Sequence, residues 1–172
     1  MRTLPGPIRT YVRWVEGTNR VLGRAVMYMI FVMMAVLLWS SISKTFFLPS
    51  LWTLEIAQFL MVAYFLLGGG YSMQLGAHVR MDLAYGRWSD RIKTRVDAVT
   101  VLFLIFYLFW LLYGGYSSLH YAFEYGERGF SAWRPYMWPI KVIMVIGIFL
   151  TLLQAIAMLF KDIAKLREAK LP

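Results

Sequence analysis

A chain of 172 residues that is 60% hydrophobic and only 16% charged differs from an ordinary soluble domain, in which about a quarter of the residues are charged. It contains no cysteine, which excludes disulfides, thiol chemistry and cysteine-bound metals. Its net charge of +9 would suit nucleic acid, but no basic and aromatic module of that kind is present, so we predict no nucleic-acid partner.

Four apolar stretches are each long enough to cross the hydrocarbon core of a bilayer, which takes about 20 helical residues. They run over about 25–43, 51–75, 98–119 and 139–160. Together they occupy most of the chain, so we predict an all-α integral membrane four-helix protein with a single domain, residues 1–172. The first stretch is too long for a cleavable signal sequence and lacks its small-residue cleavage site, so we expect it to be retained.

The segment before the first span, residues 1–24, has the pattern of an amphipathic helix. Apolar side chains recur at helical spacing from Ile8 to Leu22, and the charged side chains from Arg9 to Arg20 fall on the opposite side. We expect this helix to lie in the cytoplasmic membrane interface, with its basic side against phospholipid headgroups. The alternative is that it extends the first span into water.

Basic residues alternate between frequent and rare along the segments that separate the spans. They are frequent before the first span, in the second loop and in the tail, residues 161–172, whereas the first loop holds only Lys44. This alternation follows the positive-inside rule, so we predict that both termini are cytoplasmic. The excess positive charge then lies near the phosphates of membrane lipids.

Small residues collect in the distal half of the second span. Gly68, Ser72 and Gly76 are spaced four apart and therefore share one face of a helix. Small side chains at this spacing let another helix backbone approach closely, and packing drives helix association in lipid. We predict a helix-packing seam at these residues, with a neighbour from this chain or from another.

The third loop is the longest segment on the predicted outer face. Tryptophan and tyrosine settle at the boundary between lipid and water, and proline suits the first position of a helix such as the one that begins near Pro139. We predict three interface anchors: Trp52, Trp133 and Trp138. This loop is also where we expect the chain to contact a soluble partner.

Ionisable side chains are costly inside a bilayer, so each one marks a candidate site. Glu55 and Lys141 both lie a few residues inside spans that begin at the outer face. They could form an ion pair in the outer leaflet, and Gln58 could extend this polar cluster. The alternative is that Glu55 gains from the positive N-terminus of its helix while Lys141 reaches water by itself.

The two histidines raise the possibility of a haem or a metal ion. His78 ends the second span and His120 ends the third at the opposite face, about 30 Å away, so one iron cannot bind both. His78 and Asp82 share a helix face, but no third metal ligand lies near them in the sequence. We therefore predict no metal and no cofactor, and interpret His78 and Asp82 as a contact that fixes the helix exit.

The middle of each span lacks the groups that catalysis or ion conduction requires. The sequence there holds no carboxylate or histidine, and no nucleophile–base pair, phosphate-binding loop or HExxH motif occurs in the chain. We therefore predict that the chain is not an enzyme and does not carry a solute by itself. The pattern is typical of a subunit that works with a partner.

The run "LWTLEIAQFLMVAYFLLGGGYSMQLGAHVRMDL" resembles the small membrane subunit, DctQ-like, of tripartite ATP-independent periplasmic (TRAP) transporters. Trp52 and Glu55 open the span, three glycines follow from Gly68, and His78 and Asp82 mark its exit. The fourth span is similar to that family as well, at Pro139, Lys141, Gly147 and Gln154. The chain departs from the family at Leu54, where a second acidic residue is common.

The resemblance implies secondary active transport across a bacterial inner membrane. In that family a soluble periplasmic protein captures an organic acid and delivers it to a pair of membrane subunits. The large subunit carries the substrate with sodium ions and moves as an elevator, while the small subunit scaffolds it and helps to dock the periplasmic protein. On this basis the candidate docking residues are Glu124, Glu127, Arg128 and Arg134.

Two other functions remain open from the residues. A membrane anchor subunit of a respiratory oxidoreductase would also be small and apolar, but it would supply haem or quinone ligands within the bilayer. An independent small transporter would need a charged side chain at mid-depth, which the spans do not contain. The transported substrate is not encoded in any motif of this chain.

Overall fold

The computed structural model describes residues 6–48, 50–75 and 90–168, and this part of the chain is helical apart from its connections. The helices follow in the order α1 (Gly6–Met27), α2 (Met29–Phe46), α3 (Thr53–Gln74), α5 (Asp90–Glu124) and α6 (Trp138–Glu168). No strand occurs in these ranges. The predicted all-α fold is confirmed.

Four helical segments are long and apolar enough to cross a membrane, and they correspond in order to the four predicted spans: Gly6–Phe46, Thr53–Gln74, Val99–Glu124 and Trp138–Ala164. Several run longer than the apolar pattern, because the helices continue into polar residues. The 35 residues of α5 extend over about 52 Å, whereas the hydrocarbon core is about 30 Å thick. The ends of α5 therefore project beyond that core.

α1 and α2 form one rod with a tight turn at Tyr28. The backbone N–H of Tyr28 donates to the carbonyl of Ala25 at 3.2 Å, and the N–H of Phe31 donates to the carbonyl of Tyr28 at 3.1 Å. Bonds over three residues wind the helix more tightly than the α-helical bonds on either side. The amphipathic segment therefore runs directly into the first span with no loop between them.

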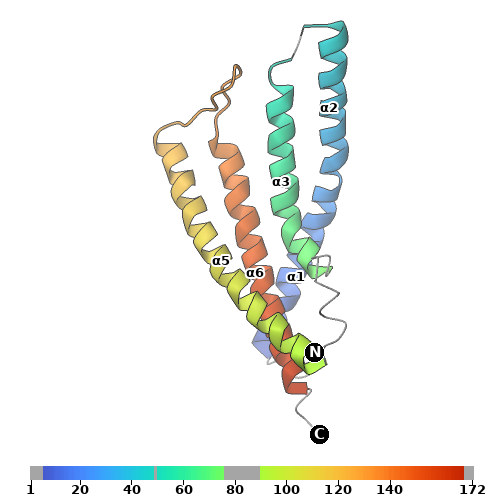
Figure 1. Ribbon diagram of the computed structural model, residues 1–172, viewed down its shortest axis with the longest axis vertical. Coiled ribbons are helices and arrows are strands. Elements are labelled where there is room, and N and C mark those ends of the chain that lie inside the picture. The colour runs from blue at the N-terminus through green and yellow to red at the C-terminus, as the bar shows by residue number, and fades with distance from the viewer. Residues whose placement is uncertain (1–5, 49, 76–89, 169–172) are drawn as a thin grey trace.

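The spans form an open layer in the order α2, α3, α6, α5 (Figure 1). α1 crosses α3 and α6 at the end of the layer that also holds the C-terminal part of α6. Toward the opposite end, called the loop end, the pair α2–α3 diverges from the pair α5–α6 (Figure 1). The loop end holds the α2–α3 connection and residues 125–137. An open layer leaves broad apolar faces that a closed bundle would bury.

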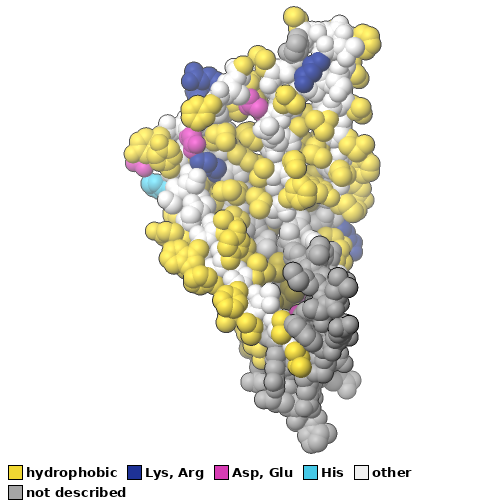
Figure 2. Space-filling model, viewed as in Figure 1, with side chains coloured by type: hydrophobic (Ala, Val, Ile, Leu, Met, Phe, Trp, Pro, Cys, Tyr) yellow, Lys and Arg dark blue, Asp and Glu magenta, His cyan; other side chains and the backbone are white. Residues whose placement is uncertain are grey.

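α6 is the central helix of this layer. One buried cluster joins α6 to α3 and α5 through Met73, Leu108 and Ile148. A second cluster joins α6 to α1 through Val12 and Val15. In the most apolar window of α6 33% of the residues are buried, against 11% in the rod of α1 and α2. Hydrophobic side chains are accordingly spread widely over the described part of the face seen in Figure 2.

The buried side of α1 is covered by the same chain. Val12, Val15, Asn19, Gly23 and Val26 are its buried residues, and α1 contacts both α3 and α6. The helix is amphipathic as the sequence indicated, and its apolar side faces protein along this length. Contact of its basic side with phospholipid stays a prediction.

Candidate functional site

Within this chain the closest helix contacts do not involve Gly68, and a seam at Gly68, Ser72 and Gly76 against another chain stays a prediction. A Cβ atom on Gly68 would lie 3.9 Å from Val26, an ordinary contact, and Gly76 lies outside the described residues. On Gly69 it would lie 3.2 Å from the hydroxyl of Thr151, and on Gly70 2.8 Å from the amide oxygen of Asn19. The close contacts therefore belong to Gly69 and Gly70, and they join α3 to α6 and α1.

Gly68 and Ser72 instead line an open groove between α3 and the rod of α1 and α2. The groove has a volume of about 500 Å³. Its walls include Met27, Tyr64 and Phe65. Small residues at the predicted spacing thus leave free space in this chain rather than fill it with a neighbouring helix. We refer to this feature as the α1–α3 groove.

A buried amide pair lies where α1, α3 and α6 meet. The side-chain nitrogen of Asn19 donates to the side-chain oxygen of Gln154 at 2.9 Å, and each residue is only 1% exposed. The Asn19 amide oxygen, which faces Gly70, has no hydrogen-bond partner among the described residues. The sequence reasoning missed Asn19. The available signal was a polar residue four positions after Val15 on the apolar side of its helix.

Further polar contacts hold α1 against α6. Lys161 forms an ion pair with Glu16, and both side chains are mostly buried. The hydroxyl of Tyr11 donates to the carbonyl oxygen of Leu153 at 3.2 Å. Glu16 lies on the charged side of the sequence pattern, yet here it faces a neighbouring helix. α1 is thus fastened to the layer by charge and hydrogen bonds as well as by apolar packing.

At the loop end, Lys141 has a different partner from the predicted one. Its ammonium donates to the carboxylate of Glu127 and to the carbonyl of Ser118 at 3.3 Å. The ion pair between Glu55 and Lys141 was one of two alternatives that the sequence left open, and it is not the contact that Lys141 makes in this structure. Because α3 diverges from α6 toward this end, the chain that folds back between α5 and α6 supplies the nearer carboxylate (Figure 1).

The rest of the predicted polar cluster is dispersed. Glu55 is partly buried in the first turn of α3, and Gln58 is exposed. Neither side chain forms a hydrogen bond or an ion pair within the described part of the chain. The position of Glu55 agrees with the alternative in which its carboxylate gains from the positive end of the helix.

Residues 125–137 form a compact hairpin between α5 and α6. The N–H of Met137 donates to the carbonyl of Glu127 at 3.0 Å, and the N–H of Gly129 donates to the carbonyl of Pro135 at 2.8 Å. The guanidinium of Arg128 lies 4.3 Å from the ring centre of Tyr136 and donates to its hydroxyl. This hairpin is an ordered surface suited to contact another molecule.

The four predicted docking residues all lie at the loop end, but they differ in availability. Glu127 pairs with Lys141 of α6, and Arg128 contacts Tyr136 within the hairpin. Glu124 is exposed and lies 3.5 Å from the ring nitrogen of His120. Arg134 is exposed at a backbone φ of 50°, and its guanidinium has no ion-pair partner among the described residues. Arg134 therefore presents an unpaired charge in this part of the chain, whereas Glu124 already contacts an exposed histidine.

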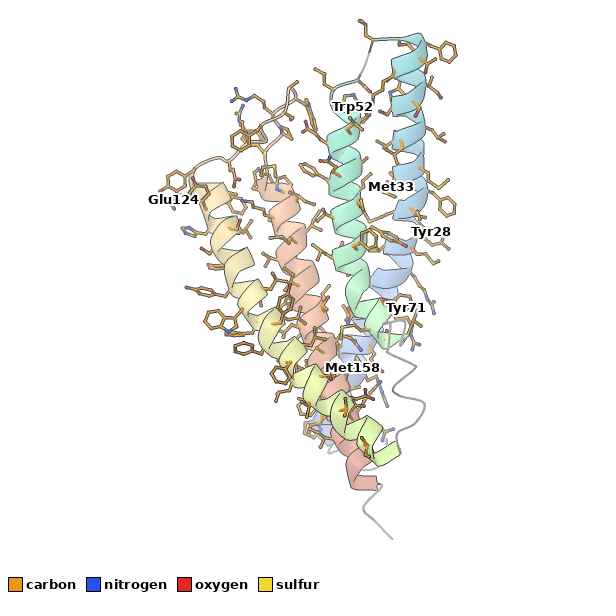
Figure 3. All side chains as sticks on the ribbon, viewed as in Figure 1. Tyr28, Met33, Trp52, Tyr71, Glu124 and Met158 are labelled. Atoms are coloured by element: carbon orange, nitrogen blue, oxygen red, sulfur yellow. The ribbon has the colours of Figure 1, made fainter. Side chains whose placement is uncertain are left out.

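The loop end also holds several exposed aromatic side chains. The predicted anchors Trp52, Trp133 and Trp138 are 41%, 42% and 40% exposed, and all belong to the loop end. Trp138 also stacks on Phe123 with ring centres 5.4 Å apart. Phe130 is fully exposed in the hairpin. Figure 3 shows Trp52 at the start of α3 and Glu124 at the end of α5. Their lipid contacts stay predictions.

The predicted helix-exit pair, His78 and Asp82, lies outside the described residues, and its role stays a prediction. Within the ranges that the structure describes, no three histidine, aspartate or glutamate side chains gather into a group that could hold a metal ion.

The comparison with family models finds one match that covers most of the chain. The model described as "Tripartite ATP-independent periplasmic transporters, DctQ component" matches residues 33–165. This range includes α3, α5 and nearly all of α6, while α1 and the first residues of α2 precede it. No protein with a curated functional description matches the chain.

Proposed function

The chain belongs to the DctQ component family of tripartite ATP-independent periplasmic transporters, and we propose that it is the fixed scaffold on which the large membrane subunit moves. It is a multi-pass transport subunit and not an enzyme, so the oxidoreductase anchor is set aside. As a small permease subunit it works with the large membrane subunit and a substrate-binding protein. The charge pattern supports the further proposal that both termini are cytoplasmic.

The open layer of helices is the observation that carries the scaffold role. The backbones of α3 and α6 approach each other closely at Gly147. A Cβ atom added there would lie only 2.8 Å from the carbonyl carbon of Leu66. Such close packing resists a change in how the two helices lie against each other. The same layer keeps wide apolar faces open, among them the side of α5 that carries Phe103, Phe106 and Trp110. A rigid body with broad apolar faces is suited to support a moving neighbour in lipid.

The distribution of charge supports the proposal that the large subunit, and not this chain, binds the solute. The ionisable contacts of the layer lie near its two ends, at Glu127–Lys141 and Glu16–Lys161. The middle parts of the four predicted spans hold no carboxylate, histidine or basic side chain that could bind sodium or an organic anion. Sodium coupling and an organic-acid substrate are carried over from the family as part of the proposal.

Reconstitution tests this proposal. Vesicles that contain this chain and the large subunit should take up the organic acid carried by the periplasmic protein when a sodium gradient is imposed. Vesicles that contain this chain alone should show no flux, because its spans offer no binding group at mid-depth. Radiolabelled uptake with and without the gradient measures both. Flux through this chain alone would overturn the scaffold role.

We also propose that the hairpin of residues 125–137 helps to dock the periplasmic protein, with Arg134 as a free positive contact. Arg134→Glu should weaken this docking by about tenfold or more, because it places a like charge against the partner's acidic group. Glu127→Gln removes the partner of Lys141 and should lower stability instead. Binding of the periplasmic protein to the reconstituted membrane pair, measured by biolayer interferometry, separates the two effects.

Lys44→Glu is the matched control, since it reverses one charge at the same end of the layer but on α2. It should leave docking within twofold of the unaltered pair. Equal binding by the Arg134→Glu and unaltered proteins would show that the hairpin does not contact the periplasmic protein through this charge.

A further inference from the structure

We propose that the α1–α3 groove binds an acyl chain of an anionic phospholipid whose phosphate is held by Arg20 and Arg24. This site goes beyond the proposed transport function and does not depend on it. The residues of α1 that line the groove precede residues 33–165, which the family model matches, in the sequence. The proposal rests on the shape of the groove, on its narrowness and on the two arginines beside it.

The groove has the size and lining of a site for an apolar ligand. Its volume of about 500 Å³ falls within the ~300–1,000 Å³ that ligand sites occupy. Val26, Met27 and Phe65 supply apolar walls. Gly68 leaves its floor open, because a Cβ atom there would meet only Val26, at 3.9 Å.

The groove is too narrow for a helix of a partner subunit. α1 and α3 touch directly beside it, where Gly23 lies against the ring of Tyr71. Asn19 and Gly70 make a second such contact. A helix with its side chains is about 10–12 Å across, so it cannot enter between two helices in contact. A single hydrocarbon chain can.

The direction of the groove matches the depth of a lipid. It begins near Leu75 and Ser72, at the end of α3, and reaches Tyr64 and Phe65 near the middle of that helix. This distance along the helix is about 15 Å, which is half the hydrocarbon thickness. An acyl chain in the groove would therefore run from the membrane surface to the bilayer centre.

Two arginines flank the groove residue Gly23 on α1. Gly23 lines the groove, Arg24 follows it directly, and Arg20 lies three residues before it. Both arginines are exposed and have no hydrogen bond or ion pair within the described part of the chain. Like charges four residues apart on a helix repel each other. A phosphate shared by both guanidinium groups removes that repulsion and accepts paired hydrogen bonds.

Native mass spectrometry of the full chain, purified with the large subunit in detergent, tests the site. Phosphatidylglycerol and phosphatidylcholine are added separately, and the number of retained lipids is measured for each. We expect one phosphatidylglycerol to be retained in preference to phosphatidylcholine. Inorganic phosphate should not displace it, because the acyl chain contributes to binding.

Arg20→Gln with Arg24→Gln should reduce the preference for phosphatidylglycerol by about fivefold for each arginine. Lysine at both positions should keep most of the preference, because it keeps both positive charges. This variant distinguishes loss of charge from a folding defect. The matched control is Arg9→Gln with Arg13→Gln, the same charge change on the same helix away from the groove. Equal losses in the two pairs, or no loss in either, would overturn the site.

Gly68→Leu fills the groove from its floor and should lower retention of both lipids while the protein stays folded. If Gly68→Leu releases the large subunit and leaves lipid retention unchanged, the groove is a protein contact and the lipid site is wrong. Neither result depends on transport activity, so failure of the scaffold role would be distinguished from failure of this site.

Discussion

Replacing Gly147 with alanine is expected to destabilise the protein by about 1–3 kcal/mol, since the added methyl group overpacks the contact between α6 and α3. A Cβ atom at this position would lie 2.8 Å from the carbonyl carbon of Leu66 and 2.9 Å from its oxygen. These atoms belong to a helix backbone and cannot turn aside as a side-chain end can. Gly147→Leu should have a larger effect and should also reduce recovery of the large subunit.

Gly114→Ala is the control for this prediction. Gly114 lies in α5, and a Cβ atom there would meet nothing within 4 Å. Alanine favours a helix over glycine by up to about 1 kcal/mol, so Gly114→Ala should be neutral or stabilising. Thermal unfolding in detergent, followed by tryptophan fluorescence, compares the two variants. A similar loss of stability in both would show that the α3–α6 contact is not close-packed at Gly147.

Replacing Asn19 with leucine should cost about 1–3 kcal/mol, because it leaves the buried amide of Gln154 without its hydrogen-bond partner. The variant with leucine at both Asn19 and Gln154 should be more stable than the sum of the single changes predicts. With both polar groups removed, neither is left unsatisfied in an apolar environment. The side chain of Gln154 is 1% exposed, so water does not offer a substitute partner.

A double-mutant cycle measures this coupling from thermal or denaturant unfolding of the four proteins. Gln58→Leu is the control, since it makes the same glutamine-to-leucine change at an exposed position. It should alter the free energy of unfolding by less than about 0.5 kcal/mol. Strict additivity of the Asn19 and Gln154 changes would contradict a hydrogen bond between them.

The apolar runs were sufficient to predict the spans. In lipid every backbone N–H and carbonyl must be paired within the segment, so an apolar stretch of about 20 residues has to be helical. The order of the four spans, the all-α fold and the amphipathic character of α1 therefore followed from residue type alone. The motifs of the second and fourth spans also indicated the family that the comparison then showed.

The pairing of side chains could not be predicted in the same way, because it depends on how helices rotate and cross. A span that is apolar on every side does not reveal which face points inward, so the spacing at Gly68 did not indicate that Gly69 and Gly70 make the close contacts within this chain. Lys141 binds Glu127 because the helices diverge at the loop end and the hairpin folds back over it.

The amide pair shows the same limit at long range. Asn19 and Gln154 are 135 positions apart in the chain, and no local periodicity links them. Only the crossing of α1 over α3 and α6 brings the two side chains together and opens the groove beside them. Local chemistry thus decided which segments enter the membrane, while the packing of distant helices decided which of their residues meet.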